Sequence, residues 1–308
     1  MSESVVVIGN FDGVHPGHRT VLAHARAAEP ALPLIVVTFW PHPASVVRPG
    51  GGPKLLTGLG ERVALLREAG ADDVRVIDFT RELSQLSPGE FVERFLLPLR
   101  PARIVVGENF RFGHQASGSV ATLAELGRGR FAVTALPLVH VRDEETCSSA
   151  VRAAIEAGDV RRAAELLGRP FRFGGIVCHG DHRGRELGFP TANLPVPQGY
   201  ACPADGVYAG WVTRLDGRDG VGHPLPAGTE APAWPAAISV GTNPTFDGAD
   251  HRVESFVLDR TDLELYHAPI AVDFVAHIRG QVRFDGIAAL IAQMDADVAE
   301  VRRALAAR

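Results

Sequence analysis

The hydrophobic positions in the first half of the chain come in short runs separated by amphipathic stretches. Residues 5–8 are four consecutive β-branched residues, which is typical of a strand buried on both faces of a parallel sheet. Further apolar runs at 34–39, 74–79, 104–107 and 131–136 also predict strands, whereas residues 62–69, 88–97 and 119–126 repeat at helical spacing. Because strands and helices alternate, the pattern predicts an α/β domain with helices on both sides of the sheet.

The pattern changes near residue 168. Short helices are predicted at 150–157 and 160–167, and glycine and proline end them at 168–170. The strand-like segments that follow lie at 171–179, 206–214, 236–241, 253–258 and 270–279. With no helix legible between them, they favour an antiparallel barrel. We therefore expect domains 1–168 and 169–308, and we interpret the apolar stripe from Ile287 to Leu305 as a helix face packed in the core.

The first strand leads into a turn and a helix start that favour an anion. Residues 9–13 include two glycines, an asparagine and an aspartate, which let the backbone turn sharply. Pro16 suits the first turn of a helix, so His15 and His18 should face the same way across its N-terminus. The helix dipole makes that end a site for anionic oxygens. An isolated H-x-x-H, however, is more often a solvated corner.

A second unusual loop, residues 107–113, follows the strand at 104–107. Phe110 and Phe112 alternate with polar residues, so they could be the buried side of an ordinary strand end. Alternatively, the two rings and Arg111 could stack on a flat heterocycle, with the Asn109 amide as a polar contact. The pattern leaves both interpretations open.

A third candidate precedes the helix at 150–157. Ser148 and Ser149 followed by Arg152 suit contact with a phosphate at a helix start. A serine N-cap with an exposed arginine explains the same residues, and without context it is the better interpretation.

Two segments of the second half carry oxygen-bearing side chains. Pro190 should prevent regular strand pairing, so Thr191 and Asn193 are expected on an irregular loop, where their oxygens suit magnesium. The preceding glycine-rich residues 179–185 could follow a phosphate with their N–H groups. Glu254 shares a strand face with Phe256, and such apolar surroundings tend to raise a carboxyl pKa toward that of a general base. A surface turn and a solvated glutamate are the alternatives.

Composition and charge exclude several classes of protein. A formal net charge of −5 gives no electrostatic reason to bind nucleic acid, and the longest apolar run, residues 32–40, is too short to cross a bilayer. The N-terminus enters a strand without a signal-peptide pattern, so we expect a cytoplasmic protein with small-molecule substrates. Three cysteines without C-x-x-C and twelve histidines without H-E-x-x-H argue against disulfides, structural zinc and a tightly bound transition metal. The sequence indicates no particular oligomeric state.

Together these segments resemble a known family across nearly the whole chain. Residues 9–18 resemble the G-x-F-D-G-x-H-x-G-H signature of the nucleotidyltransferase superfamily, and residues 106–113 resemble the V-G-x-[DN]-F-x-F-G loop of bacterial flavin adenylyltransferases. Residues 179–194, 204–210, 238–246 and 253–259 resemble the motifs of riboflavin kinases, including G-F-P-T-A-N-L and V-E-x-x-x-L-D. In this order, the motifs resemble the bifunctional bacterial riboflavin kinase/FAD synthetase family.

The resemblance implies an N-terminal Rossmann-like nucleotidyltransferase domain and a C-terminal antiparallel β-barrel riboflavin kinase domain ending in a helix. The first would adenylylate FMN to FAD, and the second would phosphorylate riboflavin to FMN with Glu254 as base. Magnesium bound with ATP would be held through Thr191 and Asn193, and charge in the first reaction would be stabilised by His15, His18 and Arg152. Matching ATP-binding positions are Gly9, Phe11, Gly13, His15, His18, Asn109, Ser148, Ser149, Thr191 and Asn193. Matching flavin-binding positions are Asn109, Phe110, Arg111 and Phe112.

The chain departs from the family pattern at two places. The family's S-S-T-x-[IV]-R aligns without gaps so that Cys147 replaces the first serine and Ser149 the threonine, whereas a one-residue deletion would keep both serines and lose the threonine. The glycine of the family's D-L-Y-G is His267 here. A kinase with a decayed adenylyltransferase half, and a ligand-binding regulator without turnover, are the competing hypotheses. Formation of FAD from FMN and ATP would exclude the first hypothesis, and formation of either FMN or FAD would exclude the second.

Overall fold

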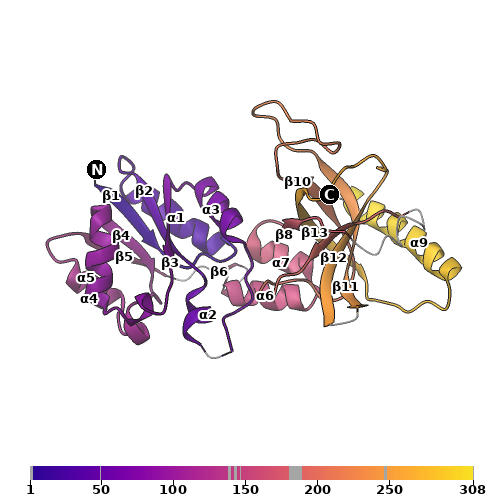
Figure 1. Ribbon diagram of the computed structural model, residues 1–308. Coiled ribbons are helices and arrows are strands. Elements are labelled where there is room, and N and C mark those ends of the chain that lie inside the picture. Colours follow the sequence, from indigo (N-terminus) through magenta and orange to yellow (C-terminus); the bar gives the residue numbers. More distant parts are fainter. Residues whose placement is uncertain are drawn as a thin grey trace. The chain divides into compact units, whose positions relative to one another are not determined.

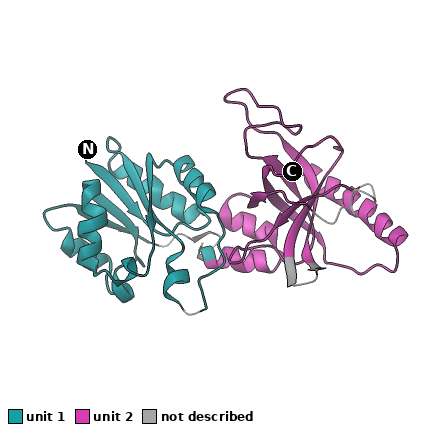
Figure 2. Ribbon diagram, viewed as in Figure 1, with its two compact units in different colours: residues 1–148 teal, residues 149–308 magenta. Residues whose placement is uncertain are grey.

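The computed structural model describes residues 3–48, 50–137, 140–141, 144–145, 147–179, 189–245 and 248–307. The chain forms two compact units, Met1–Ser148 and Ser149–Arg308 (Figures 1 and 2). Helices α6 (Ser148–Glu156) and α7 (Val160–Leu167) match the predicted helices, and they group with the second unit. The functional boundary expected at residue 168 stays a prediction.

The first unit contains a parallel sheet of five strands in the order β3-β2-β1-β4-β5. These are β1 (Ser4–Ile8), β2 (Leu34–Trp40), β3 (Asp73–Asp78), β4 (Pro101–Gly107) and β5 (Ala132–Leu136). The strand order reverses direction between β1 and β4, and in such sheets ligands bind beyond the carboxyl ends of the strands at this point. The α/β prediction is confirmed. A separate two-stranded ladder is formed by β6 (His140–Val141) and β7 (Glu144–Glu145).

Strand β1 is buried on both faces, as its β-branched run predicts. Val5 and Val7 pack in a cluster with α1 (Pro16–Ala28) and α3 (Leu59–Glu68). Val6 and Ile8 pack on the other face, against residues 88–99 and α5 (Val120–Leu126). Figure 1 shows these helices on the two sides of the sheet. The smaller helices of this unit are α2 (Pro43–Val47), η1 (Leu83–Gln85) and η4 (His114–Ala116).

The helix predicted at 88–97 is not one regular α-helix. It begins as α4 (Pro88–Phe91), continues as a π-helical turn η2 (Val92–Leu96) and ends as a 3-10 turn η3 (Leu97–Leu99). Pro98 has no N–H group for the α-helical pattern, which explains why the hydrogen bonding changes at this end.

The second unit contains an antiparallel sheet of six strands in the order β8-β13-β10-β11-β12-β9. These are β8 (Phe171–Ile176), β9 (Ala192–Pro195), β10 (Gly206–Arg214), β11 (Ala233–Thr245), β12 (Gly248–Val257) and β13 (Pro269–Arg279). Just beyond β8, the N–H of Cys178 donates to the carbonyl oxygen of Asn193 in β9 at 2.9 Å. This bond links the two edge strands, so the sheet is a nearly closed barrel, as predicted.

The last helix, α9 (Ile287–Ala306), is buried over only part of its length. Val301 and Leu305 pack with Ala209 and Leu258 in one hydrophobic cluster. Ile287 at the other end is 64% exposed. The expectation that the whole apolar stripe is core is therefore wrong for Ile287, and Leu290 and Ile291 in the first turns of the helix are only partly buried.

Candidate active sites

The turn after β1 brings the two predicted histidines together. His15 is the N-cap of α1, and Pro16 occupies the first turn, which matches the expected helix start. The imidazole rings of His15 and His18 are stacked, with centroids 3.7 Å apart. His15 is buried, and His18 is partly covered as a residue while the Nδ1 of its imidazole is buried. The solvated-corner interpretation therefore does not describe this pair.

A cavity of about 260 Å³ lies at the carboxyl ends of β1 and β4, where the strand order reverses. The histidine turn contributes His15 and His18, the loop after β4 contributes Asn109 and Phe110, and the start of α6 contributes Ser148. Segments far apart in the sequence thus line one cavity at the location that sheet topology favours for a ligand. Gly9, Phe11, Gly107 and Cys147 also belong to the lining.

Burial lowers the pKa of His18 well below its ordinary value, and the neighbouring charges of His15 and Arg62 lower it further. The imidazole is therefore neutral near pH 7 when no ligand is bound. A neutral ring still donates one hydrogen bond to a phosphate oxygen. An incoming polyanion counteracts these effects by favouring the protonated form.

The three candidate residues of the turn itself have different roles. The N–H of Gly9 donates to the carbonyl oxygen of Val37, and a Cβ on Gly9 would lie 2.8 Å from the Phe11 ring. Gly13 is outside the cavity lining, and its N–H donates to Thr57 Oγ1 at 3.2 Å. Gly9 therefore lets Phe11 pack closely, while Gly13, with a φ of 85°, shapes the turn.

Sequence reasoning missed the buried ion pair beneath this turn. Arg62 Nη2 lies 3.0 Å from Asp12 Oδ1, and both side chains are buried. Arg62 precedes the buried Leu65 and Leu66 by three and four residues, so it lies on the apolar face of α3. An arginine at a core-facing position is the signal that could have found it, because a buried cation requires a partner.

The loop after β4 places its two phenylalanines in different surroundings. Phe112 belongs to the hydrophobic core, whereas Phe110 lines the cavity and stacks on Phe112 with centroids 5.4 Å apart. Arg111 is exposed and is not part of the cavity lining. Phe112 thus fits the buried-strand interpretation, and stacking of Phe110 on a heterocycle stays a prediction.

Ser148 is tied to the histidine turn. Its hydroxyl donates to the backbone oxygen of Asp12 at 2.8 Å, and its residue lines the cavity. Ser149 is exposed and is not in the lining. Arg152 follows Ser148 by one helical turn of α6, which puts the two residues on the same helix face.

In the second unit, the expected irregular loop is partly wrong. Pro190 and Thr191 precede a strand, but Asn193 lies within β9, opposite Glu254 of β12. Strand β9 therefore starts at Ala192, two residues after Pro190, and Pro190 does not prevent the pairing of Asn193. Asn193 Nδ2 donates to both Thr191 oxygens, the backbone oxygen and Oγ1, at 3.2 Å.

The oxygen types near this register are those that a hard cation takes. The nitrogen of the Asn193 amide is directed at Thr191, and directly opposed residues on antiparallel strands, such as Asn193 and Glu254, have side chains on one face. Hydroxyl, amide and carboxylate oxygens of Thr191, Asn193 and Glu254 are thus the ligand types that magnesium takes. Glu254 also shares its face with Phe256, whose ring contacts Phe189 edge-on at 5.1 Å.

Thr191 also lines a cavity of about 300 Å³ whose walls include Val177, Val257, Leu265 and Tyr266. An apolar wall with a few polar groups is typical of a small-molecule site. The glycine-rich candidate residues 180–188 lie outside the described residues.

His267, at the position of the family's glycine, adopts a φ of 61°. This is the left-handed region that glycine occupies without strain. The substitution therefore keeps the loop conformation that a glycine would give, and the imidazole lies edge-on to His179 with centroids 5.3 Å apart.

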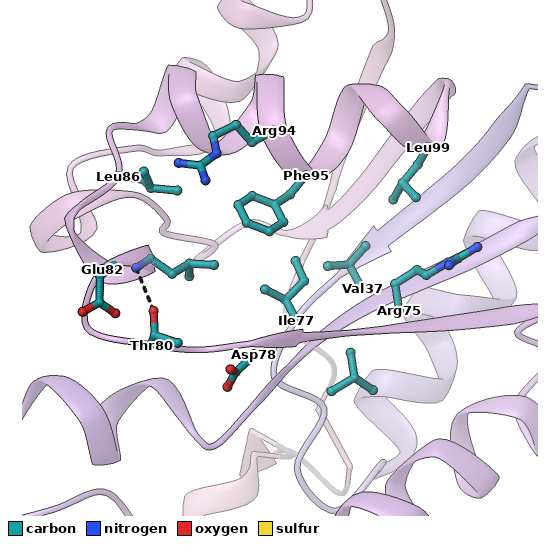
Figure 3. A pocket seen from close by; sticks show the side chains of 12 residues that line it. Val37, Arg75, Ile77, Asp78, Thr80, Glu82, Leu86, Arg94, Phe95 and Leu99 are labelled. Atoms are coloured by element: carbon teal, nitrogen blue, oxygen red, sulfur yellow. Dashed lines mark hydrogen bonds between the residues drawn. The ribbon is translucent and has the colours of Figure 1, made fainter.

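A larger cavity, of about 560 Å³, lies elsewhere in the first unit (Figure 3). It lies beside the edge strand β3, with Ile77 facing Phe95 from the 88–99 segment. Its lining contains no predicted site residue, and its charged groups, Arg75, Arg94, Asp78 and Glu82, are of both signs. Size alone therefore does not identify a site, and the predicted chemistry favours the cavity that both histidines line. The cavity beside Thr191 is lined by neither Asn193 nor Glu254.

Within the described parts of the chain, none of the helices combines the length and hydrophobicity that spanning a bilayer requires.

Comparisons with known proteins match both units. Residues 1–150 match the family model for FAD synthetase, and residues 167–305 match that for riboflavin kinase. The bifunctional riboflavin kinase/FMN adenylyltransferase of Bacillus subtilis is 32% identical over 307 residues, covering 98% of this chain and 92% of that protein. The protein of the same name from Pseudomonas fluorescens is 37% identical, with 98% and 93% covered. The crystal structure of a macrolide-efflux protein from Streptococcus pneumoniae is similar, with a TM-score of 0.84 at 31% identity, covering 98% of this chain and 94% of that one.

Proposed function

Because the chain belongs to the bifunctional riboflavin kinase/FMN adenylyltransferase family, we propose that each of its two candidate sites serves one of the family's two activities. The enzyme phosphorylates riboflavin to FMN and adenylylates FMN to FAD. We assign adenylylation to the histidine-lined cavity and phosphorylation to the site around Thr191, Asn193 and Glu254. The meeting of both histidines with Asn109 and Ser148 in one cavity carries the first assignment.

In the first site, an oxygen of the FMN phosphate attacks the α-phosphorus of ATP. A new P–O bond forms as the bond to the leaving pyrophosphate breaks, so negative charge moves from the attacking oxygen to the leaving oxygens of pyrophosphate. His15 and His18 donate hydrogen bonds to these oxygens at the N-terminus of α1, where the helix dipole adds favourable potential. Arg152 supplies positive charge from α6. The step requires alignment and charge stabilisation, and no protein nucleophile.

The neighbouring residues of this site bind the substrates. Ser148 and Asn109 supply polar contacts to ATP, and Gly9 allows Phe11 to form the cavity wall. Phe110 offers a ring face to the isoalloxazine, supported by Phe112 behind it. We also assign ATP contacts to Gly13 and Ser149, and a flavin contact to Arg111. These three residues lie outside the cavity lining, so we expect smaller effects from their replacement.

In the second site, Glu254 accepts the proton of the ribityl 5′-hydroxyl, whose oxygen attacks the γ-phosphorus of ATP. ADP leaves as the bond from the γ-phosphorus to the bridging oxygen breaks. Magnesium, when bound with ATP, supplies charge neutralisation on the phosphates. Thr191 and Asn193 would hold it through their side-chain oxygens. The register of Asn193 against Glu254 supports a common site for base and metal.

Chromatography of the products tests both assignments in one experiment. Enzyme is incubated with riboflavin, ATP and magnesium, and the flavins are separated. We expect FAD from the parent, FMN alone from a His15→Ala/His18→Ala variant, and neither from Glu254→Ala unless FMN is added. His24→Ala, on the exposed side of α1, is the matched control and should form FAD as the parent does. FAD from the double variant at the parental rate would overturn the first assignment.

A further inference from the structure

Arg62 of α3 is a cation with no surface in contact with solvent, at 0% exposed. Arginine is almost never fully buried unless it is paired. Its Nη2 donates to Asp12 Oδ1 at 3.0 Å, and Nη1 donates to the backbone oxygen of Asn10 at 3.1 Å. Its guanidinium also lies over the Trp40 ring, 5.4 Å from the centroid. The side chain therefore binds the β1–α1 turn at two residues, Asn10 and Asp12.

The Asp12 carboxylate continues this network into the chain that enters α3. It accepts from the N–H of Leu56 at 3.1 Å and from the N–H and hydroxyl of Thr57, both at 3.2 Å. The N–H of Gly13 in turn donates to Thr57 Oγ1. Residues 10–13 are thus bound to residues 56–62 by charged and neutral hydrogen bonds that are buried together.

The turn needs such support because its backbone is strained. Phe11 and Val14 have φ angles of 50° and 42°, in the left-handed region that a β-branched residue such as valine seldom adopts. Conformations of this kind persist only where the surroundings determine them. Asp12 lies between the two strained residues, and His15 follows them directly, so the direction of the imidazoles depends on this turn.

The same pair acts on the charge of the imidazoles. The charged groups that act on His18 are the stacked His15 ring and Arg62 from α3, and Cys147 lines the same cavity. Burial is the first cause of the lowered pKa of His18, and the positive charge of Arg62 contributes. Asp12, as the counterion of Arg62, opposes this contribution.

We propose that Arg62 and Asp12 are a positioning pair for adenylyl transfer, holding the strained turn that aligns His15 and His18 with the reacting phosphates. The proposal rests on the assignment of adenylylation to this cavity. Neither residue lines the cavity, so the pair acts through the histidines and not on the substrate. Displacement of catalytic groups by about 1 Å can reduce a rate about 100-fold, which sets the scale of the expected effect.

The test compares Arg62→Met, Arg62→Lys and Asp12→Asn by kcat and KM for FAD formation from FMN and ATP, between about pH 5 and about pH 9. We expect kcat near pH 7.5 to fall about 10- to 100-fold in each variant, with smaller changes in KM for ATP. Riboflavin phosphorylation by the same molecules should stay at the parental rate, which controls for enzyme concentration. Trp40 fluorescence in a Trp211→Phe/Trp234→Phe background reports folding of the first unit.

The pH profile distinguishes positioning from a purely structural role. The kcat/KM profile reports ionisation in the free enzyme, where His18 is neutral near pH 7. Arg62→Met removes a repelling cation and so raises the pKa of His18, which moves the acid limb that its protonation produces to higher pH. Asp12→Asn leaves the cation and removes its counterion, so the limb should move to lower pH or stay in place. Arg62→Lys keeps the charge and should leave the limb where the parent has it. Shifts of all variants in one direction, or an unchanged kcat, would overturn the proposal. If Arg62→Met does not fold, the other two variants decide.

Failure of the underlying assignment gives a different result. If His18→Ala forms FAD at the parental rate, adenylylation does not use this cavity. If His18→Ala is inactive while the Arg62 and Asp12 variants retain the parental rate, the cavity assignment stands and the positioning pair is refuted.

Discussion

Replacement of His18 by asparagine should remove a pH dependence of stability that originates in the buried imidazole. In the unfolded chain a histidine has a pKa of about 6.5. In the folded chain burial lowers the pKa of His18 well below this, with contributions from His15 and Arg62. Between these two values the unfolded chain binds a proton that the folded chain does not. Acidification therefore favours unfolding in this window, and above it His18 contributes nothing to the pH dependence.

The magnitude follows from the linkage relation. One group contributes at most about 1.4 kcal/mol per pH unit, and at pH 6.5 half of the unfolded chains already carry the proton. Between pH 6.5 and pH 5.5 the free energy of unfolding of the first unit should therefore fall by up to about 1 kcal/mol more in the parent than in His18→Asn. Above pH 7.5 the difference between the two should be constant.

Urea unfolding followed by Trp40 fluorescence measures this difference. Trp40 is the tryptophan of the first unit, so Trp211→Phe/Trp234→Phe leaves it as the single probe. His24→Asn on the exposed side of α1 is the control and should follow the parent at every pH. If parent and His18→Asn lose the same free energy on acidification, His18 is not the buried neutral group that the structure indicates.

Three further predictions address individual residues. In a variant whose other two cysteines are serine, alkylation of Cys147 should block FAD formation and leave riboflavin phosphorylation intact, because the added group occupies a cavity of about 260 Å³. ATP should protect the thiol from alkylation. Unchanged FAD formation by the labelled enzyme would refute the cavity assignment. Phe112→Ala should lower the free energy of unfolding by about 3 to 5 kcal/mol, whereas Phe110→Ala should lower it less and raise the KM for FMN. If urea unfolding shows that Phe110→Ala is the less stable variant, the assignment of Phe112 to the core and Phe110 to the cavity is contradicted. His267→Gly should raise the melting temperature, because glycine adopts a φ of 61° without strain, and His267→Val should lower it, because a β-branched residue is more strained there. Equal melting temperatures would show that this backbone stores no strain.

The elements that sequence predicts best are those whose limits have local causes. The strand expected at 206–214 and the helix at 160–167 are found as β10 (Gly206–Arg214) and α7 (Val160–Leu167). The side chain of Asp159 caps α7, and Gly168 ends it in a left-handed conformation. Such caps act within one turn of the chain, so the sequence carries them directly.

Strand β11 shows what a local pattern misses. The apolar run predicts 236–241, but the strand extends from Ala233 to Thr245 and includes two prolines. Proline usually excludes a position from a sheet interior, because it cannot donate to the ladder. Pro235 still pairs with Trp211, and its carbonyl oxygen accepts from the N–H of Leu258 at 2.8 Å. Pro235 therefore stays in the sheet through its carbonyl oxygen, and the partners that hold it there are not visible in the local sequence.

The candidate sites divide in the same way. The histidine pair could be predicted because a turn and a helix start fix His15 and His18 within four residues. For the Asp12–Arg62 pair, the sequence offers only that Arg62 falls on the apolar face of α3; the partner is fifty positions away, and no local pattern identifies it. The same holds for Asn193 and Glu254, whose pairing depends on the register of β9 against β12.

The two folds supply different groups to similar phosphate chemistry. A parallel sheet directs its strand ends and the N-termini of its helices to one edge, so the first site offers N–H donors and imidazoles that need not be charged. An antiparallel barrel sets side chains of adjacent strands opposite one another, so the second site offers oxygen ligands and a carboxylate at fixed register. Expulsion of pyrophosphate needs donors to oxyanions, whereas attack by a neutral hydroxyl needs a base. Each reaction is thus assigned to the fold whose backbone geometry presents the groups that it requires.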